Sequence, residues 1–462
     1  MSTKTDPSAF LAVWNHGYRR ASDISEAVAT QIRRNWFDTL AATAAGVPER
    51  CTQATWQACS VAGSDAIHPW DEALVLGTAS HALDFDDVSM LATCHPSAPP
   101  IAALLALLPL LQRQRPSLSL NDVLAAYLVG TETTLRLGQW LGFRHYALGF
   151  HATATLGTVG AAAACAHALG LPPEQAHTAL SIGASSSGGL RANFGTDVKP
   201  MHVGFAAAAA VRAALLAQAG AEASDDVWGS AGFFHAFNGG EPAPALSWKP
   251  GMAWAVETPG FEHKRFPSCY MTHRLIAGIL KLRERQGATF RSQEVSIDIE
   301  VPKNGLSALK HPRPTTGLEA RFSGPYCAAA AWIDGCVELP SFSEDAVQRP
   351  ALRAQMERVT LRERADAGES LESAPVNVTL RGPGWSDSIQ VDWAPGSGAD
   401  PMSREQFLGK WSDCAAHAGM DAGAAPMLRV LDAPLNTPAY EVLMPLHDML
   451  LSAVRQTSKE TL

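Results

Sequence analysis

Apolar residues recur at helical spacing over the first half of the chain, from about residue 8 to residue 235. Alanine-rich stretches at 158–169 and 204–220 carry small or apolar residues on nearly every face, which is typical of buried helices that approach one another closely. Asn121 marks the start of one helix, and the prolines after Gly170 follow the end of another. This half is therefore predicted to be a helical bundle.

The pattern changes after Pro267, where apolar and polar residues begin to alternate strictly. This alternation predicts half-buried strands at 295–301, 376–380 and 388–393. Helical spacing predicts helices between and beyond them, at 274–285, 326–335, 344–358, 403–417 and 440–454. Because strands and helices do not alternate regularly, the pattern indicates an α+β domain without βαβ winding.

These elements predict a mostly α protein with two domains. The large domain is expected to be all-helical and discontinuous, formed by residues 1–267 and 403–462, since the last helices are expected to return to the bundle. Residues 268–402 are expected to form the smaller α+β domain. A chain of 462 residues, 47% hydrophobic and 18% charged, is long enough for both.

Composition excludes several classes of partner. The formal net charge of −9 argues against nucleic acid. Eight cysteines without a close CxxC pair indicate reduced thiols in the cytoplasm. The longest apolar run, 101–111, is too short to span a bilayer, and the first residues do not resemble a secretory signal, so no membrane contact is expected. Neither a nucleotide motif nor zinc-ligand spacing is present, so no cofactor and no metal are expected.

Chemistry is concentrated between His81 and Ser97, which hold three carboxylates and two imidazoles beside apolar helix. Proton transfer at a carbon acid needs such groups, because a shielded base can have its pKa moved toward neutrality. The alternative is structural, since an Asp often caps a helix and His95 precedes a proline at a helix start. Asp84 and Asp87, three residues apart, can share one helix face.

Two further polar clusters follow, and together the segments resemble the MmgE/PrpD family, which includes 2-methylcitrate dehydratases, cis-aconitate decarboxylases and iminodisuccinate epimerase. The resemblance covers most of the chain. It rests on His81-Ala-Leu-Asp-Phe-Asp-Asp with His95-Pro-Ser downstream, on Gly149-Phe-His-Ala-Thr-Ala-Thr-Leu-Gly, on Asn193-Phe-Gly-Thr-Asp-Val-Lys-Pro with His202, and on Lys264-Arg-Phe-Pro-Ser. It implies a helical large domain, an inserted α+β lid, a site between them and a homodimer.

The resemblance also implies roles for individual residues. Asp84, His95 and Lys199 match positions that lie in the family's site, and they are the expected catalytic residues. For Lys199 the alternative is a salt bridge to Asp197. His151 stands at the expected start of a buried helix, where a bound anion is favoured, and its alternative is a core histidine bonded to a nearby threonine.

The remaining candidates are expected to bind a small anionic di- or tricarboxylate. Lys264 lies at the junction of the two domains, a natural place to touch a substrate. The others, which can complete a basic pocket or support it, are His202, Arg265, Tyr270 and His273.

Cys269 departs from the decarboxylase members, which resemble one another in carrying a histidine there. A thiol near Lys264, Arg265 and His273 can ionise and act as a second base, and the alternative is a buried apolar cysteine. Val88 is a second departure, because it replaces a threonine hydroxyl of the decarboxylases.

These acidic and basic side chains predict a cofactor-independent enzyme that removes a proton α to a carboxylate. Epimerisation of an iminodisuccinate-like substrate, with Cys269 as one of two bases, is the main expectation. Dehydration of 2-methylcitrate or citrate and decarboxylation of cis-aconitate are the catalytic alternatives. A non-catalytic carboxylate-binding member of the family is the alternative from another class.

Overall fold

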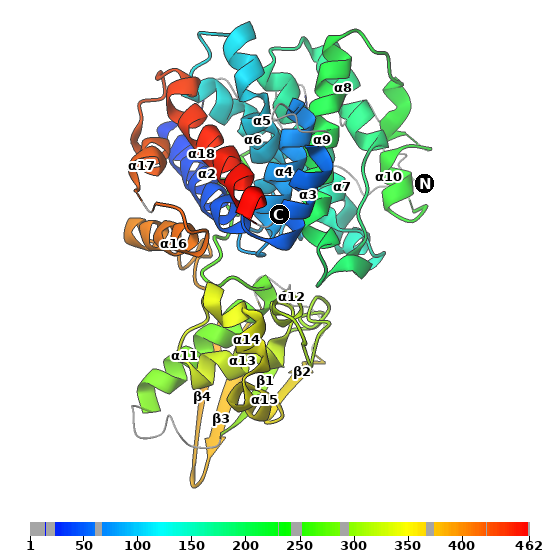
Figure 1. Cartoon of the computed structure of the whole chain (residues 1–462). Coiled ribbons are helices and arrows are strands. Elements are labelled where there is room, and N and C mark those ends of the chain that lie inside the picture. Colours follow the sequence, from blue (N-terminus) through cyan, green and yellow to red (C-terminus); the bar gives the residue numbers. More distant parts are fainter. Residues whose placement is uncertain are drawn as a thin grey trace.

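The computed structural model describes residues 14, 24–60, 67–229, 231–241, 252–286, 295–365, 374–421 and 423–460. Two hydrophobic cores lie within them. The larger core is built from helices at both ends of the chain, and the smaller core lies between a sheet and the helices packed on it. In Figure 1 the helical part lies above the α+β part. The mostly α class with a smaller α+β part is thereby confirmed, whereas the predicted start of the first helix lies outside the described residues.

Helices account for the larger part. Those from the first half of the chain are α2 (Glu26–Gly46), α3 (Arg50–Cys59), α4 (Pro69–His81), α5 (Ala98–Gln114), α6 (Leu120–Ala147), α7 (Ala152–Ala168), α8 (Pro173–Ser185), α9 (Val198–Gln218) and α10 (Phe233–Phe237). Those from the C-terminal segment are α16 (Arg404–His417), α17 (Ala425–Asp432) and α18 (Ala439–Glu460).

Small residues let the central helices pack closely. A Cβ on Gly77 of α4 would lie 2.8 Å from the Cα of Gly204 of α9, so the two backbones touch at these glycines. Helix α9 is the one described helix long and apolar enough to cross a membrane, but 67% of its apolar window is buried inside the protein. Its packing between α4 and α7 is that of a core helix.

The α+β part contains one mixed sheet. Its strands are β1 (Ser296–Val301), β2 (Val359–Glu363), β3 (Val376–Gly382) and β4 (Trp385–Val391), in the order β2-β1-β3-β4. Its helices are α11 (His273–Gln286), α12 (Gly317–Ala320), α13 (Gly324–Ile333), α14 (Glu344–Gln348) and α15 (Pro350–Met356). Helix α11 packs on β3 and β4, and α13 packs on β2.

Two sequence predictions for this part are wrong. Strand β2 was not predicted, because it has only five residues and directly follows the helical spacing of 344–358; it pairs parallel to β1 through a helical crossover, so one βαβ connection is present where none was expected. The single helix predicted at 344–358 is two helices, since Pro350 cannot donate the backbone hydrogen bond that a continuous helix needs.

The C-terminal helices return to the helical part, so this part is discontinuous. Arg33 of α2 donates to the carbonyls of Val430 and Ala433. Lys410 of α16 forms a buried ion pair with Asp38 of α2 at 2.7 Å. In Figure 1, α16 lies where the helical part meets the α+β part. The exact domain boundaries remain a prediction.

Candidate active site

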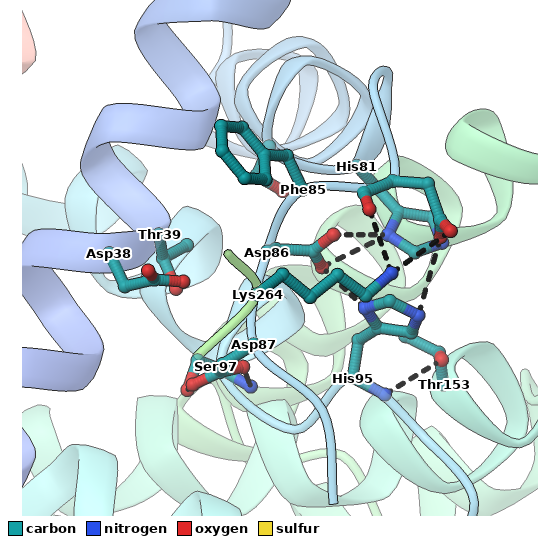
Figure 2. A network of polar contacts seen from close by, with 12 residues as sticks. Asp38, Thr39, His81, Phe85, Asp86, Asp87, His95, Ser97, Thr153 and Lys264 are labelled. Carbon is teal, nitrogen blue, oxygen red and sulfur yellow. Dashed lines mark hydrogen bonds and ion pairs between the residues drawn. The ribbon is translucent and has the colours of Figure 1, made fainter. Parts of the chain in front are cut away.

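The carboxylate-rich segment begins where α4 ends. Helix α4 stops at His81, and Asp84 adopts a left-handed backbone with φ of 52°, which a non-glycine residue rarely adopts. The chain therefore leaves the helix before the carboxylates begin. The predicted common helix face of Asp84 and Asp87 is wrong for this reason: Asp87 turns to Ser97, whose backbone N–H and hydroxyl donate to it (Figure 2).

Asp84 is the centre of the site and is held by two lysines. Lys199, in the first turn of α9, lies 2.6 Å from Asp84 Oδ1. Lys264 lies 2.9 Å from Asp84 Oδ2 and also donates to the Asp84 carbonyl at 2.7 Å. All three side chains are buried. The alternative partner of Lys199, Asp197, pairs instead with Arg50 at 2.9 Å, so Lys199 belongs to the site.

Asp86 organises the imidazoles beside this centre. His81 Nδ1 lies 3.0 Å from both Asp86 oxygens, and its Nε2 lies 2.8 Å from Lys199 Nζ. His95 Nδ1 lies 3.1 Å from Asp86 Oδ2, and its Nε2 lies 3.5 Å from Asp84 Oδ1. Figure 2 shows Asp86 facing both rings. Asp86 is thus a partner of both imidazoles.

Burial and charge act in opposite directions on these groups. Burial opposes the ionisation of Asp84, but Lys199 and Lys264 outweigh it and hold the pKa of this carboxyl well below its usual range. Burial lowers the pKa of His81 to about 3 despite Asp86, and it also lowers the pKa of His95. At neutral pH the site therefore presents an ionised Asp84 beside neutral imidazoles.

The same cluster has the composition of a cation site. The ligand atoms of His81, Asp84, Asp86 and His95 lie within 4.8 Å of one another. The positive charge beside Asp84 is supplied by the two lysines, whose nitrogens are within 3 Å of its two oxygens. The two lysines therefore already neutralise Asp84, the carboxylate on which binding of a cation here would mainly depend.

His151 and His202 form a second pair of imidazoles. Their Nδ1 atoms lie 3.1 Å apart, and the His151 ring stacks on His81 with centroids 5.6 Å apart. Burial, with Lys199 as the next cause, lowers the pKa of His151 well below its usual range and the pKa of His202 to about 4. The alternative of a His151 side chain bonded to a threonine is wrong, because its partner is another histidine.

Asp84, His95 and His151 border a half-open pocket. The helical part contributes Asp84, His95, His151, Thr153, Lys199 and Lys264 to its lining. The α+β part and the segment leading into it contribute Cys269, Tyr270, Met271, Ser307, Ala308 and Phe322. The pocket thus lies between the two parts, with its charged groups on the helical side and a largely apolar wall opposite.

Cys269 lines the pocket but does not have the predicted reactivity. Burial, with a contribution from Asp84, raises the pKa of its thiol to about 11. Its side chain packs in a cluster with Tyr146, Phe194 and Phe322. The prediction of an ionised second base is therefore wrong, because desolvation outweighs the field of the nearby lysines.

Three other predicted residues, Arg265, His273 and His202, do not border the pocket. Arg265 is exposed, because its neighbours Lys264 and Phe266 point inward and it points to the opposite side. His273 is buried at the start of α11, where its Nε2 lies 3.3 Å from the carbonyl of Ser268. It supports the segment of Cys269 and does not reach the pocket. His202 likewise acts behind His151.

Sequence reasoning missed His81 and the aromatic wall formed by Phe143, Tyr146, Phe194 and Phe322. His81 stands in the same segment as Asp84. Its position at the end of a helix, five residues before Asp86, was the signal that could have identified it as a site residue. Phe143 and Tyr146 lie on α6, but Phe194 and Phe322 come from distant segments, so only the fold brings the four together.

This two-part fold, with an Asp–Lys–Lys centre and imidazoles at the junction, defines a class, and comparison of the sequence with known families identifies it. The MmgE/PrpD N-terminal domain matches residues 10–245, and the MmgE/PrpD C-terminal domain matches residues 266–432. The chain belongs to the MmgE/PrpD family.

Several proteins with similar sequences are named as cis-aconitate decarboxylases. The cis-aconitate decarboxylase of Homo sapiens is 31% identical over 353 residues, covering 74% of this chain and 72% of that protein. The Mus musculus enzyme is 30% identical over 357 residues, covering 74% and 71%. The Aspergillus terreus enzyme is 26% identical over 435 residues, covering 84% and 88%. The chain is thus a family enzyme of the kind that acts on polycarboxylates, and the expectation of epimerisation finds no support among these relatives.

Proposed function

We propose that this protein is a carboxy-lyase that decarboxylates cis-aconitate or a closely related unsaturated tricarboxylate. The observation that carries the proposal is the ionised Asp84 held between Lys199 and Lys264 at the wall of the pocket between the two parts. Similarity to cis-aconitate decarboxylases over about three quarters of the chain supports the same choice.

The state of Cys269 argues against the epimerase alternative. Epimerisation through a carbanion needs two bases on opposite faces of one carbon. The sequence predicts Cys269 as the second of these bases. A thiol with a pKa near 11 stays protonated at neutral pH. Decarboxylation needs a proton donor but no second base, so it suits this pocket better.

The charges fit a polyanionic substrate. Each lysine nitrogen that contacts Asp84 also borders the pocket, where it can contact a substrate carboxylate. The lysines are buried and the wall opposite is largely apolar, and a surrounding of low polarity strengthens these contacts and favours loss of the charged carboxylate as neutral carbon dioxide. As the bond to that carboxylate breaks, its electron pair shifts along the double bond, and one proton from an acid in the site completes the new C–H bond.

Val88 and Cys269 bear on the exact substrate. Both line the pocket, and both replace residues that are polar in the decarboxylase members that the chain resembles. The pocket therefore has fewer hydrogen-bonding groups for carboxylates than those members. A substrate slightly less polar than cis-aconitate is for this reason included in the proposal.

Proton NMR of the purified protein with cis-aconitate, 2-methylcitrate, citrate and iminodisuccinate tests the proposal. Loss of the vinyl signal of cis-aconitate together with release of carbon dioxide and appearance of itaconate supports it. Lys199→Met should abolish this reaction, and Lys303→Met, at an exposed lysine, is the matched control. Inversion or deuterium exchange without loss of carbon dioxide would instead indicate an epimerase. Loss of water would indicate a dehydratase, and no reaction with any substrate would favour a binding role.

A further inference from the structure

His81 lies one layer behind the pocket, and both of its ring nitrogens contact groups of the site. It is fully buried at the end of α4 and does not border the pocket. Its Nε2 lies 2.8 Å from Lys199 Nζ, and its Nδ1 lies 3.0 Å from both oxygens of Asp86. Asp86, His81 and Lys199 thus form a continuous chain of contacts that ends on a side chain facing the substrate.

The contacts fix the tautomer of His81. A carboxylate can only accept hydrogen bonds, so the Nδ1 atom that faces Asp86 carries the proton. The Nε2 atom of a neutral ring is then a lone pair, which can accept from the Lys199 ammonium. Burial keeps the ring neutral by lowering its pKa to about 3, with Lys199 and His95 adding to that effect and Asp86 opposing it.

This arrangement determines where the protons of Lys199 point. An ammonium has three N–H groups, and two of them are directed at Asp84 Oδ1 and at His81 Nε2. The third remains for the pocket, where the rings of Phe194 and Phe322 lie 5.3 and 5.1 Å from Nζ. If the third proton leaves, the other two keep their acceptors, so the nitrogen does not need to turn.

We propose that His81 is a positioning residue, held by Asp86, that aims Lys199 so that this lysine protonates the substrate carbon as carbon dioxide leaves. The inference rests on the proposed decarboxylation. The carbon–carbon bond breaks, its electron pair moves along the double bond, and the Lys199 N–H forms the new C–H bond. The resulting amine regains a proton from solvent. Among the described residues, the Lys264 ammonium contacts Asp84 and not His81, so a change at His81 acts directly on Lys199.

Two substitutions separate the two contacts of the ring. His81→Asn places an amide nitrogen near the Nδ1 position, so it keeps the donor to Asp86 and removes the acceptor for Lys199. His81→Gln places an amide near the Nε2 position and so keeps an acceptor for Lys199. The proposal predicts that H81N lowers kcat by about 10²-fold or more while KM changes by less than about threefold, and that H81Q stays within about tenfold of the wild type.

His145 provides the matched control. It is also a buried, neutral histidine with two hydrogen bonds, to Thr155 Oγ1 at 2.7 Å and to the carbonyl of Phe237 at 2.9 Å, but it contacts no residue of the Asp84 cluster. H145N should lose thermal stability and keep kcat. Equal kcat losses in H81N and H81Q, or a loss in H145N as large as that in H81N, would overturn the positioning role.

NMR of the protein labelled with ¹⁵N-histidine tests His81 without any turnover, with its signals assigned by their loss in H81N. A pyridine-type shift for Nε2 and a protonated Nδ1 support the proposal, and a protonated Nε2 would overturn it. If wild-type protein does not convert cis-aconitate, the proposed function fails, while the tautomer still decides whether His81 can hold Lys199.

Discussion

Lys410 offers a sharp test of how the C-terminal segment supports the site. Its ammonium lies 2.7 Å from Asp38 Oδ1 and donates to the carbonyls of Phe85 and Lys264 at 2.7 and 3.0 Å. Both charged side chains are essentially inaccessible to solvent. Phe85 follows Asp84 and Lys264 contacts it, so one side chain from α16 joins both backbone segments that carry the catalytic centre.

Replacement of this lysine should be costly because of what it leaves behind. Lys410→Met leaves a buried Asp38 without its cation and two carbonyls without a donor, and breaking a buried pair in this way costs about 3–5 kcal/mol of unfolding free energy. Replacing both partners, in Asp38→Leu with Lys410→Met, should restore the part of the loss that comes from the unpaired charge, since an apolar pair needs no counter-charge, while the two carbonyls still lack their donor. The variants therefore predict a strongly non-additive double-mutant cycle.

Urea denaturation followed by circular dichroism measures the cycle. Arg404→Met is the control, because Arg404 lies on the same helix and pairs with Asp432 at 2.6 Å, but at the surface. An exposed pair of this kind contributes about 0–1 kcal/mol. A Lys410→Met cost as small as that of the control, or a double variant less stable than either single one, would refute the reasoning.

Three further outcomes follow from the charges of the site. The pKa values of His95 and His151 are lowered by burial, and Asp84 stays ionised, so kcat/KM should not fall near pH 6.5, the ordinary histidine pKa; a pH–rate profile with a step there would contradict this. Because the Cys269 thiol is protonated, Cys269→Ser should keep kcat within about tenfold, whereas loss of a general acid or base costs about 10²–10⁴-fold in a steady-state assay. Burial raises the pKa of Asp38 to about 6, so the native state binds this proton more tightly than the unfolded chain, and stability should decrease as pH rises from about 4 to about 6; melting curves of Asp38→Asn should lack this slope.

Periodicity predicts the parts of this fold in which burial follows a regular spacing. Helix α9 and strand β3 were both expected, because α9 is apolar on nearly every face and β3 alternates strictly. Strand β2 was missed because its alternation lasts only four residues and begins directly after helical spacing, whereas the other edge strand, β4, alternates over seven residues. The break at Pro350 was available from the sequence, but helical spacing on both sides concealed it.

The candidate site was predictable to the extent that its residues share short segments. Asp84, Lys199 and Lys264 could be proposed from their segments, but the salt bridges that join them connect residues more than a hundred positions apart. The state of Cys269 could not be inferred, because the sequence shows the neighbouring cations and not the burial that outweighs them.

The charges of this site also explain why its parts depend on one another. Asp84 is ionised because two lysines face it, and the lysines tolerate burial because Asp84 lies between them. Burial keeps the His81 ring neutral, and Asp86 fixes its proton on Nδ1, so that Nε2 is free to accept from Lys199. Removal of any one group therefore leaves a buried charge or lone pair unsatisfied, and the cost reaches groups that it does not touch. Activity should for this reason be lost together across the cluster, in a non-additive manner, as expected for residues that act as a unit.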